Sequence, residues 1–186
     1  MPVFVDHKLK LTYDDLREIP EDDPYRHEII DGMHVASPSP VRRHQYVSKR
    51  LQYQLYTLIE LAGYGEMYAA PMDVELGRYD VFEPDLLVIL NHNAQIMEES
   101  HIRGVPDLAV EILSPSTASR DRGIKRERYE KAGIPEYWVV DANENQVEVH
   151  VLDPATCEFR APQVARESLE YRFATGAVTI DLTQVW

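Results

Sequence analysis

The chain has 186 residues, a formal net charge of −13, 27% charged residues and 44% hydrophobic residues. This length and balance predict one domain with a substantial core, and no apolar run is long enough for a transmembrane helix. The single cysteine, Cys157, excludes an internal disulfide and a zinc site built on paired thiolates. The acidic charge argues against general affinity for nucleic acid, because phosphate contacts require Lys and Arg.

The N-terminal part of the chain predicts a short helix and a β-hairpin. Charges interrupt every apolar stretch there, so no signal peptide is predicted and a cytoplasmic protein is expected. Thr12 can cap a short helix. Residues 25–36 predict two strands joined at Asp31-Gly32, a dipeptide that favours hairpin turns. Glu28, in the first strand, is interpreted as a solvated side chain, with a further acid near a site as the alternative.

A long helix is predicted over residues 41–62. Ser39 suits its N-cap and Pro40 its first position, and Gly63 can end it. One face carries side chains at helical spacing and is expected to be buried. These side chains are His44, Val47, Leu51, Leu55, Leu58 and Ala62. His44 is either a histidine at the core edge with a backbone partner, or a proton carrier or phosphate contact beside a site.

Two continuous apolar runs predict neighbouring central strands. Residues 86–90 follow Asp85, and residues 108–113 follow Asp107 and contain Glu111. Such runs are typical of strands buried on both faces. The polar residues 91–103 between them predict a loop with a short helix, so the two strands are expected to pair antiparallel.

A strand–helix–strand unit follows. The helix is predicted from about Asp121 to Ala132, with Ser119 or Asp121 as its cap and Gly133 as its terminator. The next strand, residues 136–141, is expected to lie parallel to the strand before the helix, because such crossovers are right-handed. Further strands are predicted at 147–152, 171–173 and 178–182. No repeat or linker divides the chain, which predicts a single domain over residues 1–186.

Three residues are candidates for catalysis: Asp85, Glu111 and Lys125. A carboxylate inside an apolar strand is unfavourable unless a cation, a metal or several donors compensate it, so we hypothesise that Glu111 binds a metal ion. Lys125 and Tyr129 share a helix face, which brings the lysine to the acids if that face turns toward the sheet. A solvated lysine is the alternative.

This combination of residue types suits phosphodiester hydrolysis. Mg²⁺ takes one or two carboxylates and keeps several waters, and it polarises phosphate and generates hydroxide. A lysine can orient the attacking water and offset charge in the transition state. Motifs for other chemistries, such as a Walker loop, GxGxxG, HExxH, GxSxG or CxxC, do not occur. Asp107 precedes Glu111 by roughly 13 Å of strand, which is too far to share one ion, so it is interpreted as strand-end structure or as support behind the metal ligands.

The segments PDLLVIL and GVPDLAVEILSPSTASRDRGIKRERYEKAGIPEYWVVD resemble the Uma2 family (formerly DUF820), which is similar to the PD-(D/E)XK restriction-endonuclease-like nucleases. The resemblance implies an α/β, restriction-endonuclease-like fold, with a central mixed β-sheet flanked by helices and an additional N-terminal β-hairpin. It implies that Asp85 and Glu111 are the two motif acids. Leu113 stands where the superfamily has its lysine, so the resemblance implies that the lysine has moved to Lys125.

The expected function is therefore a Mg²⁺- or Mn²⁺-dependent DNA endonuclease, with Asp85 and Glu111 as metal ligands and Lys125 as the third catalytic residue. Further candidates are His44, Glu28, Tyr129 and Asp107. A homodimer is expected because cutting two strands commonly calls for two sites. The alternative, favoured by the acidic charge, is a catalytically inactive nuclease fold that serves in binding or scaffolding. Hydrolysis of RNA or of another phosphoester is a third possibility.

Overall fold

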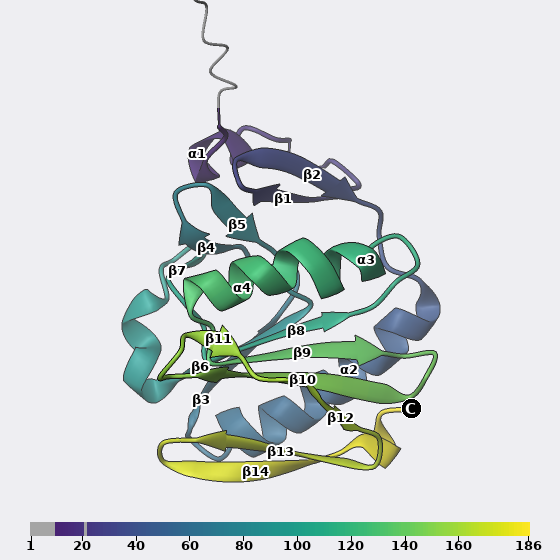
Figure 1. Cartoon of the computed structure of the whole chain (residues 1–186). Helices are drawn as coiled ribbons and strands as arrows, with labels where there is room; N and C mark the ends of the chain where they lie inside the picture. Colours follow the sequence, from purple (N-terminus) through teal and green to yellow (C-terminus); the bar gives the residue numbers. More distant parts are fainter. Residues whose placement is uncertain (1–9, 21) are drawn as a thin grey trace, which may run out of the picture.

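A seven-stranded mixed sheet lies at the centre of the protein, with helices on its faces (Figure 1). The structure is a computed structural model, and it describes residues 10–20 and 22–186. The strand order is β11-β10-β9-β8-β6-β3, with β12 beside β10. The bounds are β3 Gly65–Ala69, β6 Leu86–Leu90, β8 Leu108–Ile112, β9 Glu136–Asp141, β10 Gln146–Asp153, β11 Glu158–Phe159 and β12 Gln163–Ala165.

The pairing of the central strands agrees with the expectation from the sequence. β6 and β8 are antiparallel, and β8 and β9 are parallel across the intervening helix. All residues of β6 and β8 are buried, as continuous apolar runs predict. Alternate residues of β8 point to opposite faces. Val110 packs toward α2 and Ala109 toward α4, so Glu111 faces the α4 side.

A second sheet of five strands, in the order β2-β1-β5-β4-β7, lies over the α4 side (Figure 1). Its bounds are β1 Arg26–Ile30, β2 Met33–Ser37, β4 Val74–Gly77, β5 Asp80–Phe82 and β7 Ile102–Arg103. The predicted hairpin is present as β1 and β2, and its turn has positive φ at Asp31 and Gly32. The short helix α1, Tyr13–Leu16, is capped by Thr12 and Asp15, as predicted.

Helix α2 covers the other face of the central sheet. It spans Arg42–Leu55 and continues as a π-helical turn, η1, over Tyr56–Glu60. The prediction of its start was wrong, because the N-cap is Val41 and not Ser39. The π turn inserts one residue and rotates the buried face by one position. Ile59 is therefore fully buried, while Leu58, expected in the core, is only half-buried and Ala62 is exposed.

The crossover helix begins earlier than predicted and contains a kink. α3 (Ala118–Arg120), η3 (Asp121–Lys125) and α4 (Arg126–Ala132) follow one another without a break. Gly123 has non-helical dihedral angles inside the π turn. Asp121, predicted as a cap, therefore lies inside the helical segment. The terminator is Gly133, as predicted, in the left-handed conformation that glycine adopts readily.

A C-terminal hairpin completes the molecule beside α2. β13 (Ser168–Phe173) and β14 (Gly176–Asp181) pair with each other and are followed by the 3₁₀ turn η4 (Leu182–Gln184). Another 3₁₀ turn, η2 (Asn91–Ile96), follows β6 directly in the chain. Leu169 and Ile180 of the hairpin join the core cluster that α2 forms with the central sheet. Among the described residues, no helix combines the length and the apolar character needed to span a membrane.

Candidate active site

The register of β6 and β8 brings two acids together. Leu86 lies opposite Val110 in this antiparallel pair, and one further step along the register sets Asp85 against Glu111. The backbone N–H of Ile112 donates a hydrogen bond to Asp85 Oδ2 at 2.7 Å, which fixes this arrangement. Directly opposed residues of antiparallel strands have Cα atoms about 4.5–5.5 Å apart and side chains on the same face. Both acids are buried, and both line one cavity at this end of the strand pair.

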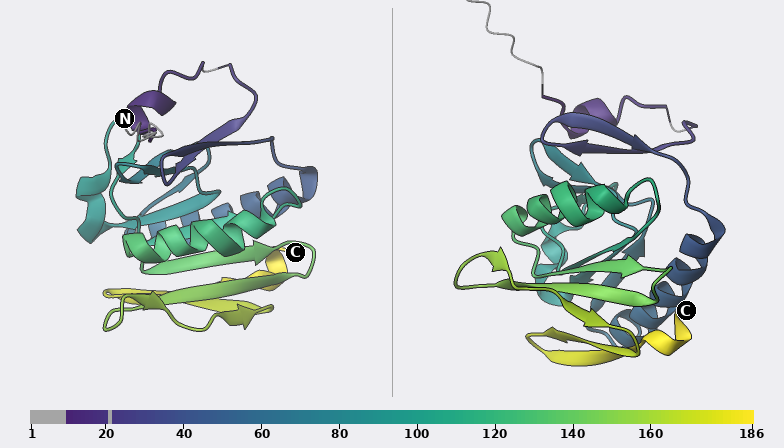
Figure 2. Two further views of the ribbon diagram at one scale, coloured as in Figure 1. Left: turned by 45° about the horizontal axis from the view of Figure 1, so that its top comes forward. Right: turned by 45° about the vertical axis from the view of Figure 1, so that its right-hand side comes forward.

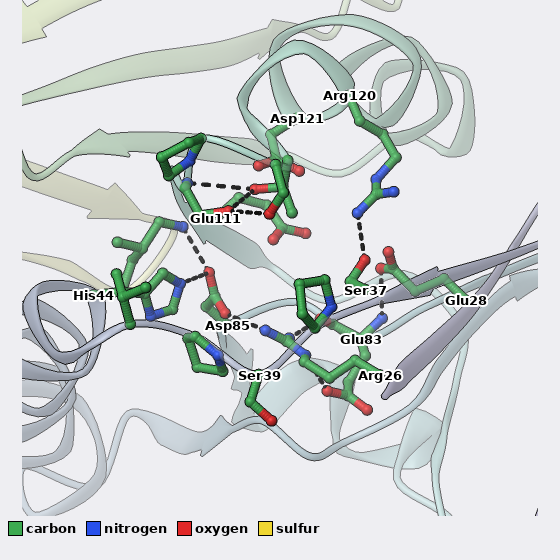
Figure 3. Close-up of a pocket in the computed structure, with 18 of the residues that line it drawn as sticks. Arg26, Glu28, Ser37, Ser39, His44, Glu83, Asp85, Glu111, Arg120 and Asp121 are labelled. Carbon is green, nitrogen blue, oxygen red and sulfur yellow. Dashed lines mark hydrogen bonds and ion pairs between the residues drawn. The ribbon is translucent and has the colours of Figure 1, made fainter. Parts of the chain in front are cut away.

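Asp85 lies between two cationic or polar partners. Arg26 donates from Nη1 to Oδ1 at 2.7 Å, and His44 Nε2 lies 3.0 Å from Oδ2 (Figure 3). Burial by itself raises the pKa of Asp85, but the hydrogen bonds and charges of His44 and Arg26 outweigh it and lower the pKa to about 2. Asp85 is therefore an anion throughout the physiological pH range.

Glu111 is held from the helix side. Lys125 Nζ lies 2.7 Å from Glu111 Oε1 and 2.7 Å from Glu28 Oε1, and 3.9 Å from Asp121 Oδ1. The hydroxyl of Tyr129 donates to Glu111 Oε1 at 2.8 Å. One buried ammonium thus lies among three buried carboxylates from β1, β8 and η3.

The shortage of positive charge raises the affinity of this cluster for protons. Burial raises the pKa of Glu111 to about 8, and the charges of Asp121, Asp85 and Glu28 add to the effect against the attraction of Lys125. The pKa of Lys125 is raised above its usual value, because its neighbouring carboxylates outweigh the effect of burial. Lys125 therefore remains charged, and two of the carboxyl groups that share it, Glu111 and Asp121, retain protons to a higher pH than usual because their pKa values are raised.

The expected position of Glu28 on the surface was wrong. Its side chain is buried, and besides Lys125 it accepts a hydrogen bond from the backbone N–H of Glu83 at 3.1 Å. The sequence pattern could not show this, because β1 belongs to the second sheet and that sheet lies over the crossover helix. His44 and Tyr129 both lie against the acids, and Lys125 points inward.

Asp107 lies at the opposite end of β8 from Glu111. Its Oδ2 accepts hydrogen bonds from the backbone N–H of Leu90 at 2.8 Å and from Asn93 at 3.2 Å. These contacts hold the end of the strand pair, and Asp107 does not line the cavity beside Asp85 and Glu111.

Two residues of the site, Arg26 and Asp121, were not predicted as functional. Arg26 binds Asp85 and also donates to the side chain and the backbone carbonyl of Glu83. Asp121 is buried, and its Oδ1 has no hydrogen-bond partner among the described residues. Burial raises the pKa of Asp121. The one available signal was the spacing of Asp121, four residues before Lys125 on the same helix.

A cavity of about 250 Å³ opens onto these side chains (Figure 3). Hydroxyl side chains from the end of β2 and from the loops after β2 and β8 line the cavity beside the acids. These residues are Ser37, Ser39, Ser114, Ser116 and Thr117. Arg120, in α3, donates a hydrogen bond to Ser37 Oγ and so joins α3 to β2. The cavity thus combines acidic groups with hydroxyl groups that can form hydrogen bonds.

The donor set fits a hydrated divalent cation rather than a cage made only of protein ligands. In the described part of the chain, no group of three or more His, Cys, Asp or Glu side chains is arranged to hold a metal ion. Mg²⁺ needs only one or two carboxylates when water and phosphate complete its shell, which Asp85 and Glu111 can supply. Three buried carboxyl groups share the single ammonium of Lys125, and Asp121 Oδ1 accepts no hydrogen bond among the described residues, so the cluster can accommodate a further cation.

Comparisons with known proteins identify the family and the fold of the chain. The model of the Uma2 family, described as "Putative restriction endonuclease", matches residues 13–178. Among solved structures, the chain is similar to a crystal structure of "a putative nuclease belonging to DUF820" from Anabaena variabilis, with a TM-score of 0.75 and 18% identity, covering 94% of this chain and 97% of that one. At this identity the likeness shows the fold. No curated protein matches the chain.

Proposed function

Because the chain belongs to the Uma2 family, we propose that it is a divalent-metal-dependent DNA endonuclease whose active site is the cavity that holds Asp85, Glu111 and Lys125. One observation carries the proposal. Two buried carboxylates and a buried ammonium, from positions far apart in the chain, line one cavity at the end of the β6–β8 pair, with the ammonium of Lys125 on Glu111. Folding alone does not require these charged groups, because buried charges are unfavourable in a protein core.

Each side chain has a role that follows from its contacts. Asp85 and Glu111 would hold Mg²⁺ or Mn²⁺, which would polarise the scissile phosphate and make a bound water more acidic. Arg26 and His44 keep Asp85 ionised and fix its orientation. Lys125 can donate a hydrogen bond to the attacking water and offset the negative charge that grows on the phosphate oxygens.

Two further residues support Glu111 and Lys125. Tyr129 donates to the Glu111 oxygen that also contacts Lys125, so the carboxylate cannot rotate freely. Glu28 holds Lys125 from the opposite side. Positioning of this kind raises the rate because reacting groups need little reorganisation.

DNA is the proposed substrate, and a homodimer is the proposed active form, because cleavage of both strands of a duplex calls for two active sites. The second candidate function is a nuclease fold that binds without turnover. Its specific support is that both oxygens of Asp85 already have partners, in Arg26, His44 and the Ile112 amide.

The test is cleavage of supercoiled plasmid DNA in the presence of Mg²⁺ or Mn²⁺. We expect nicking by the wild type and loss of about 10²–10³-fold in rate for Glu111→Gln and Lys125→Met. Parallel reactions with RNA and single-stranded DNA identify the class of substrate.

Matched controls separate loss of chemistry from loss of fold. Glu136→Gln changes another buried acid, at the start of the strand next to β8 and outside the cavity. Lys131→Met changes an exposed lysine near the end of the same helical segment as Lys125. If wild type and both site variants cleave equally, or only at the background rate, the catalytic proposal is wrong and the binding role is favoured.

A further inference from the structure

The surface of α2 has a charge opposite to that of the protein as a whole. Between Val41 and Ile59 the sequence contains four cations and no Asp or Glu, in a chain with 32 acidic residues. The four cations are Arg42, Arg43, Lys49 and Arg50. A helix that lacks acids in such an acidic chain has a surface potential that favours an anionic partner.

The charges of these cations are not neutralised within the described structure. Elsewhere, Arg26, Arg122 and Lys125 all pair with carboxylates. By contrast, none of the four cations of α2 forms an ion pair with a described residue. Arg43 and Arg50 instead donate to the backbone carbonyls of residues 142 and 184, which anchors both guanidinium groups and leaves their charge uncompensated.

The exposed face of α2 also carries aromatic rings. Tyr53 is 70% exposed and Tyr56 is 40% exposed, and Arg42 and Lys49 are exposed as well. The four positions follow one another at intervals of seven, four and three residues, so they lie on one stripe of the helix. We call these four residues the α2 stripe. At 1.5 Å per residue the stripe is about 21 Å long.

The α2 stripe begins next to the candidate active site, because Val41, the N-cap of α2, lines the cavity and Arg42 follows it in the chain. His44, in the first turn of the same helix, contacts Asp85, while Arg42 begins the stripe on the opposite, exposed side of that turn. The right-hand view of Figure 2 shows α2, drawn in blue, along one side of the molecule. A chain bound in the cavity can therefore continue along α2.

We propose that the α2 stripe binds a single-stranded segment of the nucleic acid whose scissile phosphate lies in the cavity. This inference rests on the proposed function and narrows its substrate to nucleic acid with unpaired bases beside the cleavage point. Lys and Arg pair with phosphates, and tyrosine rings stack on bases that are not already stacked in a duplex. Two exposed tyrosines that follow two cations without ion-pair partners among the described residues along one helix face fit a single strand better than the phosphate backbone of a duplex, which offers no base faces.

The experiment measures binding without cleavage. Fluorescence anisotropy of a labelled single-stranded DNA, long enough to span the stripe, is recorded in EDTA against the full-length protein. We expect Arg42→Gln/Lys49→Gln and Tyr53→Ala/Tyr56→Ala each to weaken binding by about tenfold or more. The salt dependence, plotted as log K against log salt, is expected to become shallower by about 1.4 for the first pair, at about 0.7 per lost phosphate contact on a single strand.

A matched control carries the same change of charge elsewhere. Arg78→Gln/Lys131→Gln also removes two exposed cations, from the β4–β5 turn and from the end of α4. Binding by this variant is expected to equal that of the wild type. Circular dichroism checks that all variants retain the fold, which is expected because every substituted side chain is exposed.

The outcomes separate this inference from the proposed function. If the wild type does not bind, if it prefers duplex of the same sequence, or if the stripe and control variants behave alike, the inference is wrong, whatever the plasmid assay shows. If stripe variants change the sedimentation of the free protein, the stripe is an interface between copies and the inference is also wrong. Selective loss of single-strand binding supports it even if no cleavage is detected.

Discussion

Lys125 Nζ lies 2.7 Å from Glu111 Oε1, and both side chains are buried. The lysine comes from the π turn of the crossover helix and the glutamate from the strand before it. A lysine placed two residues after Glu111 on the strand would point to the same face as Glu111, whereas here the helix supplies the ammonium from above. This contact gives Glu111 an ammonium partner from the helix, although Leu113 occupies the strand position two residues after it.

Replacement of Lys125 by methionine is expected to lower both stability and activity. The substitution keeps the length of the side chain but leaves Glu28 and Glu111 without their common cation. Removal of one partner of a buried ion pair costs about 3–5 kcal/mol. Urea unfolding at pH 8 measures the loss, with Lys131→Met as the exposed control. Equal unfolding free energies for the two variants would mean that the buried contacts of Lys125 contribute little.

Replacement of Tyr129 by phenylalanine isolates one hydrogen bond. The ring keeps its edge contacts with Phe82 and Tyr137, but Glu111 loses the hydroxyl donor at 2.8 Å. Loss of a hydrogen bond to a charged group lowers the unfolding free energy by about 1.5–3 kcal/mol. We also expect slower cleavage, because Glu111 is less firmly oriented.

Tyr137→Phe is the comparison for this variant. Its hydroxyl donates to the backbone carbonyl of Asp121 at 3.0 Å and does not touch a carboxylate. The Tyr129 variant should therefore lose more cleavage activity than the Tyr137 variant. The opposite order would argue that Tyr129 only fills the core.

Glu136 is expected to make stability fall as pH rises. Burial raises its pKa to about 7 against the opposing hydrogen bond from Trp138. A raised pKa means that the folded state holds its proton more tightly than the unfolded state. The resulting stability is fully present below pH 4.5, the ordinary value for this group, and is lost as pH rises to about 7.

The Glu136→Gln variant removes this titration and keeps an oxygen that can accept from Trp138. The unfolding free energy of the variant minus that of the wild type should increase by about 3 kcal/mol from pH 4.5 to pH 8, at about 1.4 kcal/mol per unit of pKa shift. Chemical denaturation of both proteins across this range gives the difference. Parallel pH profiles would show that Glu136 ionises freely in the folded protein.

The central strands and their pairing were predictable because their signals are local. Apolar runs at β6 and β8, the glycine after α4 and the spacing of the crossover unit determine their neighbours. The start of α2 was not predictable from Ser39, because a proline-rich connector offers several capping positions and tertiary contacts select among them.

Part of the candidate site was predictable for the same reason. Asp85 and Glu111 stand out because acids are rare at the ends and in the middle of buried strands. Glu28 and Asp121 did not stand out. Glu28 is buried by a second sheet whose position depends on long-range contacts, and Asp121 is turned inward by a π turn at Gly123 that periodicity does not reveal.

The central claim is that Asp85 and Glu111 together bind a divalent cation, and titration calorimetry with Mn²⁺ tests it most directly. The account predicts saturable Mn²⁺ binding to the wild type and to Glu136→Gln. It predicts an Mn²⁺ affinity at least about tenfold weaker for Asp85→Asn and Glu111→Gln, because loss of a metal ligand, or of a group that orients one, weakens metal binding by this amount. Equal Mn²⁺ affinity in all four proteins would contradict it, as would the absence of binding to the wild type.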